Sequence, residues 1–258
     1  MVISRHARKI MKRRGRKNNK LIKDNFCSSI ESLPNELLTE IVARVASFSF
    51  KSYINAKLSC KVFHEVANER YVYQNATLVD FPLLNLWLKP KQEKINKITS
   101  FLELCRECGN TEALYRKGVM DLFRNDRPEL ALELVKRAAK GGHIGAFYVI
   151  GIIMVFMGGD FKRKGVILIG NMKKTRPLRK ITRECRKKLV KILRNIWVLN
   201  PLVYGERPTC CTIQHQRIRK NGWPVDSDDE DEDKDIYFRC DACNCDAEIA
   251  YIFAVLRR

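Results

Sequence analysis

The stretch from Ser32 to Val45 reads SLPNELLTEIVARV and decides how the first part of the chain folds. Its apolar residues recur at spacings of three and four, which is the pattern of a helix with one apolar side. Pro34 suits the first turn of this helix, because the N–H that proline lacks would be unpaired there. The apolar stripe consists of Leu37, Leu38, Ile41, Val42 and Val45. A surface is needed to cover this stripe.

Two more short helices are expected after the stripe, one around Tyr53 to Leu58 and one from Val62, closing at about Leu78. The resulting unit, residues 30–78, is near the lower size limit at which a core can stabilise a domain alone. Burial of each stripe side chain contributes about 1.5–3 kcal/mol. The sum is comparable to the entropic cost of ordering the segment. A partner that covers the stripe would therefore tip the balance towards folding.

These residues resemble an F-box, whose frame is LPxELL followed by a hydrophobic-Cys-Lys-x-aromatic segment. The second part is matched here by LSCKVF at 58–63. The gap before Cys60 is longer than in many F-boxes, and Tyr73 stands where tryptophan is common. The resemblance implies binding to a Skp-type adaptor, and through it to a cullin, by Leu33, Pro34, Leu37, Leu38, Ile41, Leu58, Cys60, Lys61 and Phe63. The alternative is an ordinary helical subdomain whose stripe packs on the rest of the chain.

A repeat follows. EALYRKGVMDLF at 112–123 and GAFYVIGIIMVF at 145–156 match at a constant displacement of 33 residues. The matched residues include Ala113 and Ala146, Tyr115 and Tyr148, and Gly118 and Gly151. Because the small residues let two helices approach closely, we predict stacked helical hairpins over residues 98–172. They are similar to Sel-like repeats, relatives of tetratricopeptide repeats. Gly165 and Gly170 depart from the pattern and leave the end of the array open.

The whole chain is predicted to be mainly α, because apolar residues alternate nowhere for long. Its 258 residues carry a formal charge of +20, which favours acidic partners or nucleic acid. Residues 1–28 are expected to form a disordered basic tail, and KRRGRK at 12–17 favours the nucleus, with the cytoplasm also open. No secretory signal is recognised, which predicts reduced cysteines. The longest apolar run, Ala146 to Met157, is too short to span a membrane.

A basic amphipathic helix is predicted over residues 180–198, with Cys185, Leu189 and Ile192 on its apolar face. Such a helix can lie on a membrane surface, enter a calmodulin-type groove or contact nucleic-acid phosphates. The favoured interpretation is a capping helix that covers the last repeat with its apolar side.

Residues 207–258 form a Cys/His-rich segment interrupted by the acidic run DSDDEDEDKD at 226–235, which is expected to be a flexible solvated loop. A Cys-x2-Cys pair presents two thiolates to one tetrahedral ion, and a second pair with a histidine can complete the shell. The predicted set for a structural zinc is Cys210, His215, Cys240 and Cys243, although the Cys210-Cys211 doublet leaves the choice of ligand open. Clustered free thiols are the alternative.

An F-box, Sel-like hairpins and a cysteine-rich end together resemble one group of plant F-box proteins. The resemblance implies a non-catalytic subunit of a Skp-cullin-F-box ubiquitin ligase, whose repeats or tail bind a target protein. The four histidines show no partnered nucleophile or carboxylate spacing, so an enzyme is not favoured. The main alternative is a basic nucleic-acid-binding protein with a zinc knuckle. The sequence, however, shows no motif that is known to recognise RNA or DNA.

Overall fold

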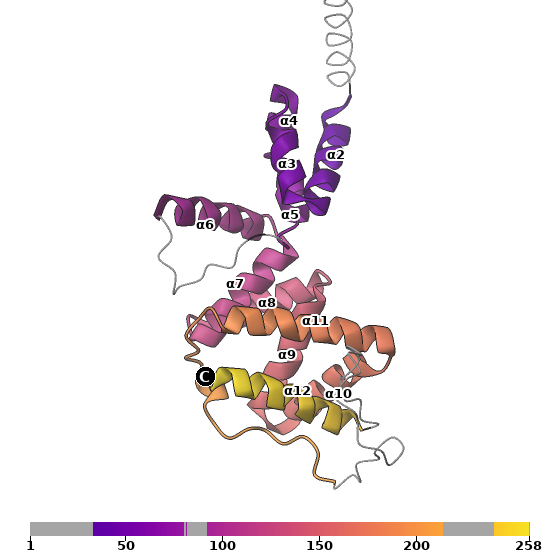
Figure 1. Ribbon diagram of the computed structural model, residues 1–258, viewed down its shortest axis with the longest axis vertical. Coiled ribbons are helices and arrows are strands. Elements are labelled where there is room, and N and C mark those ends of the chain that lie inside the picture. The colour runs from indigo at the N-terminus through magenta and orange to yellow at the C-terminus, as the bar shows by residue number, and fades with distance from the viewer. Residues whose placement is uncertain (1–32, 80, 82–91, 214–239, 258) are drawn as a thin grey trace, which may run out of the picture. The chain divides into compact units, whose positions relative to one another are not determined.

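The computed structural model describes residues 33–79, 81, 92–213 and 240–257. These residues are mostly helical and contain no strand, which confirms the prediction of a mainly α fold (Figure 1). The chain divides into two compact units, residues 1–80 and 81–258, which we call unit 1 and unit 2. No described helix combines the length and the apolar character that crossing a membrane requires.

Unit 1 contains four short helices among its described residues. They are α2 (Asn35–Phe48), α3 (Phe50–Lys57), α4 (Lys61–Val66) and α5 (Arg70–Asn75). Three helices were predicted here, and the third is divided into α4 and α5 by the turn at Ala67 to Glu69. The starts of α3 and α4 are capped by side chains. The hydroxyl of Ser49 accepts the N–H of Ser52, and the thiol of Cys60 accepts the N–H of Phe63.

Helix α2 has two apolar faces that serve different purposes. Leu38, Val42 and Ala46 are buried in the core of unit 1, whereas Leu37 and Ile41 are exposed. Successive residues of an α-helix are rotated by about 100°, so neighbours such as Leu37 and Leu38 cannot share one direction. The single stripe expected from the sequence is therefore two rows, one buried and one exposed.

Long-range hydrogen bonds close unit 1. The Tyr53 hydroxyl donates to the carbonyl of Ala67 at 3.1 Å, and the N–H of Thr77 donates to the carbonyl of Ala46 at 2.9 Å. Tyr73 is buried and donates its hydroxyl to the Asn68 side chain at 3.0 Å. The bond from Tyr53 joins α3 to the end of α4, and the bond from Thr77 joins the segment after α5 to α2.

The two faces of α2 give a first prediction. Leu38→Ala should lower the free energy of unfolding of unit 1 by about 2–5 kcal/mol, because it leaves a cavity in the core. Leu37→Ala should change it by less than about 0.5 kcal/mol, since its side chain is exposed. Urea unfolding followed by hydrogen exchange of peptides within 33–79 measures both variants. Equal effects of the two substitutions would contradict the assignment of faces.

Unit 2 is built from helical hairpins and covering helices. Its described elements are α6 (Gln92–Glu107), α7 (Thr111–Arg124), α8 (Pro128–Lys140), α9 (Ile144–Met157), α10 (Gly159–Lys173), α11 (Arg176–Leu193), the 3-10 turn η1 (Pro201–Val203) and α12 (Asp241–Leu256). Helices α7 and α8 form one hairpin and α9 and α10 the next (Figure 1). One continuous core runs from α7 to α12.

The 33-residue repeat extends to the turns and caps that precede the matched helices. Gly109 and Gly142 have φ values of 88° and 87°, a left-handed conformation that glycine adopts without strain. The next residues are the N-caps. Asn110 accepts the N–H of Ala113 at 3.1 Å, and His143 accepts that of Ala146 at 3.1 Å. The turn chemistry of the two copies is thus the same, although the capping side chains differ.

The glycines in the middle of the helices mark close approaches. A Cβ atom on Gly118 would lie 2.9 Å from the carbonyl oxygen of Ala131 in α8, and one on Gly165 would lie 2.7 Å from that of Gly151. A Cβ atom on Gly170 would lie 2.6 Å from the carboxyl carbon of Asp241 in α12. Gly165 and Gly170 therefore let α10 pack against α9 and α12, and the array continues through this helix.

Helices α11 and α12 cover the second hairpin. The apolar side of α11, including Cys185, Leu189 and Ile192, is buried in the core of unit 2. This placement matches the capping interpretation of the basic helix, because its apolar face is already covered. Helix α12 is held by a buried carboxylate. Glu248 accepts the hydroxyl of Tyr148 at 2.8 Å, the ammonium of Lys173 at 2.9 Å and the guanidinium of Arg186 at 2.8 Å.

The two matched tyrosines differ in their hydroxyl partners, and this gives a second prediction. Tyr148 bonds Glu248, whereas the buried hydroxyl of Tyr115 has no hydrogen-bond partner within the described part of the chain. Tyr148→Phe should lower the free energy of unfolding of unit 2 by about 1.5–3 kcal/mol, because it removes a bond to a charged group. Tyr115→Phe should be neutral or slightly stabilising. Thermal unfolding of the two variants checks this difference, and a larger loss for Tyr115→Phe would overturn it.

Candidate functional site

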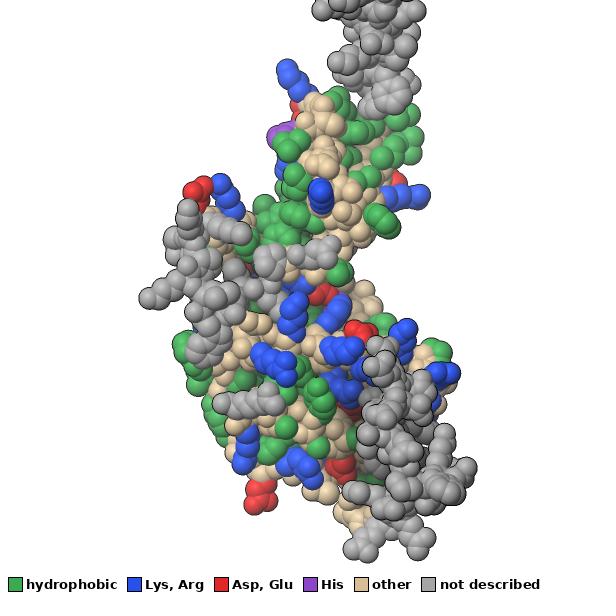
Figure 2. Space-filling model, in the orientation of Figure 1, with side chains coloured by type: hydrophobic (Ala, Val, Ile, Leu, Met, Phe, Trp, Pro, Cys, Tyr) green, Lys and Arg blue, Asp and Glu red, His purple; other side chains and the backbone are tan. Residues whose placement is uncertain are grey.

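The exposed row on α2 is the first candidate site. Leu33, Leu37 and Ile41 follow one another at intervals of four residues, and their side chains are 37%, 52% and 43% exposed. Leu37 and Ile41, four residues apart, lie on the same face of α2, and Leu33 precedes the Pro34 cap of this helix. Hydrophobic side chains gather over α2 in Figure 2. Leu38, which was predicted as a contact, is only 1% exposed and belongs to the core instead.

The second predicted contact segment lies around the start of α4. Leu58 is 75% exposed, Lys61 is exposed, and Phe63 is partly buried. Cys60 is partly buried, and its sulfur caps α4 by accepting the N–H of Phe63 at 3.5 Å. A cysteine at this position therefore helps to begin the helix that presents Lys61 and Phe63.

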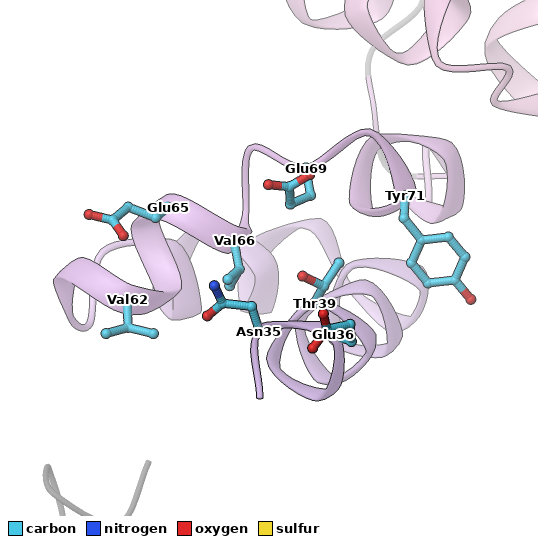
Figure 3. A pocket seen from close by; sticks show the side chains of 8 residues that line it. All are labelled: Asn35, Glu36, Thr39, Val62, Glu65, Val66, Glu69 and Tyr71. Carbon is cyan, nitrogen blue, oxygen red and sulfur yellow. The ribbon is translucent and has the colours of Figure 1, made fainter. Parts of the chain in front are cut away.

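A groove of about 560 Å³ lies between these two segments, with side chains from α2 on one side and from α4 on the other (Figure 3). Asn35 and Thr39 line it from α2, and Val62 and Val66 line it from α4. Glu36, Glu65 and Glu69 add negative charge. Three of the lining residues are direct sequence neighbours of predicted contacts: Asn35 follows Pro34, Glu36 precedes Leu37, and Val62 lies between Lys61 and Phe63.

A cysteine cluster is the second candidate site. The sulfur atoms of Cys211, Cys240 and Cys243 all lie within 4.8 Å of one another, an arrangement that could hold a metal ion. Cys240 is the N-cap residue of α12, and Cys243 follows in its first turn. The backbone N–H groups of Cys243 and Ala242 point towards the Cys240 thiolate and hold its pKa below the usual range.

The structure brings Cys211 to this cluster, in place of the Cys210 that was predicted from the sequence. Cys210 points instead towards Cys245, with 3.4 Å between the two sulfur atoms. His215, the other predicted ligand, lies outside the described residues. Both cysteines of the doublet therefore contact the start of α12, but they meet different partners: Cys210 meets Cys245, and Cys211 meets Cys240.

A charged cluster that the sequence analysis missed joins the two hairpins. The Glu112 carboxylate accepts bonds from Arg116 at 2.7 Å and from the Nε2 of His143 at 2.9 Å, and Lys188 of α11 lies 3.6 Å away. Nδ1 of His143 accepts the N–H of Ala146, so the ring proton is on Nε2 and is donated to Glu112. The His143 ring also stacks on Tyr115. The 33-residue displacement could have revealed His143, because it matches the capping residue Asn110.

This cluster gives a pH-dependent prediction. Burial alone would raise the pKa of Glu112, but the bond from His143 and the charge of Arg116 outweigh it and lower the pKa from 4.5 to about 2. A carboxyl group with a lowered pKa stabilises the fold above its unfolded pKa, and this contribution is lost as the pH falls through the folded value. Glu112→Gln should therefore lower the free energy of unfolding by about 2–3 kcal/mol at neutral pH. The difference from wild type should shrink below pH 4.5 and vanish near pH 2.

Urea unfolding of both proteins across this pH range measures the effect. Glu184→Gln is the matched control. Glu184 forms an ion pair with Lys187 on α11 but is 55% exposed, and an exposed pair contributes less than about 1 kcal/mol. A difference between wild type and Glu112→Gln that did not depend on pH would contradict the role of the carboxylate.

The fold and the sites define a class of protein: a small helical unit with an exposed apolar row, followed by tetratricopeptide-like hairpins and a cysteine cluster. Comparison with known families agrees. Residues 81–194 match the family described as plant tetratrico peptide repeats.

Two proteins of Arabidopsis thaliana are similar to the chain. The putative F-box protein At1g67623 is 29% identical over 217 residues, which covers 79% of this chain and 70% of that protein. F-box protein At2g35280 is 32% identical over 132 residues, which covers 51% of this chain and 76% of that protein. No solved structure gives a significant match. The chain belongs to the plant F-box proteins that carry helical repeats.

Proposed function

We propose that the chain is a substrate-recruiting subunit of a Skp-cullin-F-box ubiquitin ligase. The observation that carries the proposal is the exposed apolar row Leu33, Leu37 and Ile41. Leu33 directly precedes the Pro34 cap of α2, and Leu37 and Ile41 lie on this helix, whose other face is the core of unit 1. The F-box relatives support a Skp-type adaptor as the molecule that covers this row.

The energetics favour a protein partner of this kind. Complete burial of an aliphatic side chain contributes about 1.5–3 kcal/mol. A partner surface that covers the row and Leu58 therefore gains this binding free energy from several side chains. Leu38, Val42 and Ala46 keep the helix in place from behind, so little ordering is needed when the partner binds. The row is therefore preorganised for docking.

Unit 2 is proposed to hold the target protein. Stacked helical hairpins commonly offer an extended surface to a peptide or protein. In this mechanism the chain itself is non-catalytic: it raises the local concentration of the target near the ligase, and other subunits make the bonds. The basic segment KRRGRK at 12–17 supports action in the nucleus, and action in the cytoplasm is the other possibility.

Co-expression with a Skp-type adaptor tests the proposal. The wild-type chain should co-purify with the adaptor, and a variant with Leu33→Ala, Pro34→Ala and Leu37→Ala should lose at least about 90% of it, since three contacts of about 1.5 kcal/mol would be removed. All three residues are exposed, so the variant should remain folded. A circular dichroism spectrum checks this.

The matched control replaces three exposed leucines and isoleucines of unit 2, Leu104, Leu130 and Ile167, by alanine. This control should keep the adaptor. Cellular proteins recovered with the wild type and lost with the α2 variant would be candidate neighbours in the ligase. A wild-type chain that does not co-purify with the adaptor would refute the proposal. If that chain is also retained on nucleic acid in a strongly salt-dependent manner, the nucleic-acid-binding alternative is favoured.

A further inference from the structure

The cysteines at the two ends of the 214–239 segment lie close enough to share one ion. The sulfur atoms of Cys211 and Cys240 are 3.9 Å apart, and Cys243 completes a triangle with no edge above 4.8 Å. Two thiolates that each lie about 2.3 Å from one tetrahedral zinc are separated by about 3.8 Å. A disulfide would require about 2.05 Å. The spacing of Cys211 and Cys240 therefore fits a shared metal.

The position of Cys211 is set by a carboxylate on α12. Asp246 accepts the backbone N–H of Cys210 at 2.6 Å with one oxygen and that of Cys211 at 2.9 Å with the other. This two-point contact fixes the doublet so that Cys210 meets Cys245 and Cys211 meets Cys240. Asp246 is thus a positioning residue, which acts on the backbone of a ligand rather than on the ion.

Helix α12 is itself a fixed platform. Glu248 lies further along the same helix, is 1% exposed and is held by Tyr148, Lys173 and Arg186 from three other helices. Cys245 is fully buried in the core. The first turn of α12 therefore presents Cys240 and Cys243 in a defined direction, and no large rearrangement is needed to form the site.

We propose that Cys211, Cys240 and Cys243 bind one Zn²⁺, with Asp246 positioning Cys211. Three thiolates are soft ligands and favour zinc over hard ions such as Mg²⁺ or Ca²⁺. The fourth tetrahedral position is left for a further ligand. The ion would join residues 29 positions apart in the sequence and hold both ends of the intervening segment at unit 2. The site is independent of adaptor binding by unit 1.

Metal analysis of the full-length protein, purified under reducing conditions without chelator, tests the proposal. Wild type should contain about one equivalent of zinc. Cys211→Ser, Cys240→Ser and Cys243→Ser should each lose most of it. Cys210→Ser and Cys245→Ser are matched controls from the neighbouring thiol pair and should retain it. With Co²⁺ in place of zinc, the same three variants should lose the thiolate charge-transfer band.

Less than about half an equivalent of zinc in reduced wild type would overturn the proposal. It would also fall if Cys210→Ser lost the metal while Cys211→Ser kept it. Adaptor binding should be the same with and without zinc, so failure of this site can be distinguished from failure of the proposed ligase function.

The role of Asp246 has its own measurement. Asp246→Asn should weaken zinc binding by about 10–100-fold in chelator competition, because outer carboxylates tune metal affinity on that scale. The Co²⁺ band should keep its shape, since all three thiolates remain. A chelator should lower the unfolding temperature of wild type but not that of Cys211→Ser. If Asp246→Asn bound zinc with unchanged affinity, Asp246 would not be a positioning residue.

Discussion

The buried carboxylate of Glu248 is the interaction on which the second unit depends. It is 1% exposed, and an isolated charge at such a depth would be strongly destabilising. Its partners come from three helices: Tyr148 from α9, Lys173 from α10 and Arg186 from α11. Such a set of partners can be satisfied only when all of these helices and α12 are in place. The carboxylate therefore specifies one arrangement of α12. Because Cys240 and Cys243 lie at the start of this helix, their positions depend on that arrangement.

Much of unit 2 could be predicted because a repeat carries information about its own geometry. The matched Gly118 and Gly151 lie at close approaches between helices, and the matched Ala113 and Ala146 are buried, as the 33-residue displacement indicated. Gly165 and Gly170 could not be interpreted in the same way. A glycine inside a helix can mark either a break or a close approach. The partners that decide are the backbone of Gly151 and the side chain of Asp241, which belong to other helices, α9 and α12.

The candidate sites show the same limit. A period of 3.6 residues located the apolar residues of α2, but it did not separate Leu37 from Leu38, because the direction of the core is set by α3 to α5. The Cys-x2-Cys pair located Cys240 and Cys243. The choice between Cys210 and Cys211 was not accessible, since it depends on two hydrogen bonds to Asp246, which lies 36 and 35 residues further on.

The two units differ in how completely they bury their apolar side chains and pair their buried charges. Unit 2 has one continuous core through its hairpins, α11 and α12, and its buried charges have partners within it. Unit 1 has a small core around Leu38, Val42 and Tyr53, and it leaves Leu33, Leu37 and Ile41 towards solvent. Small domains gain little from burial and tolerate such exposure only at a cost in stability. The exposed row on so small a unit therefore supports the proposal that a partner covers α2.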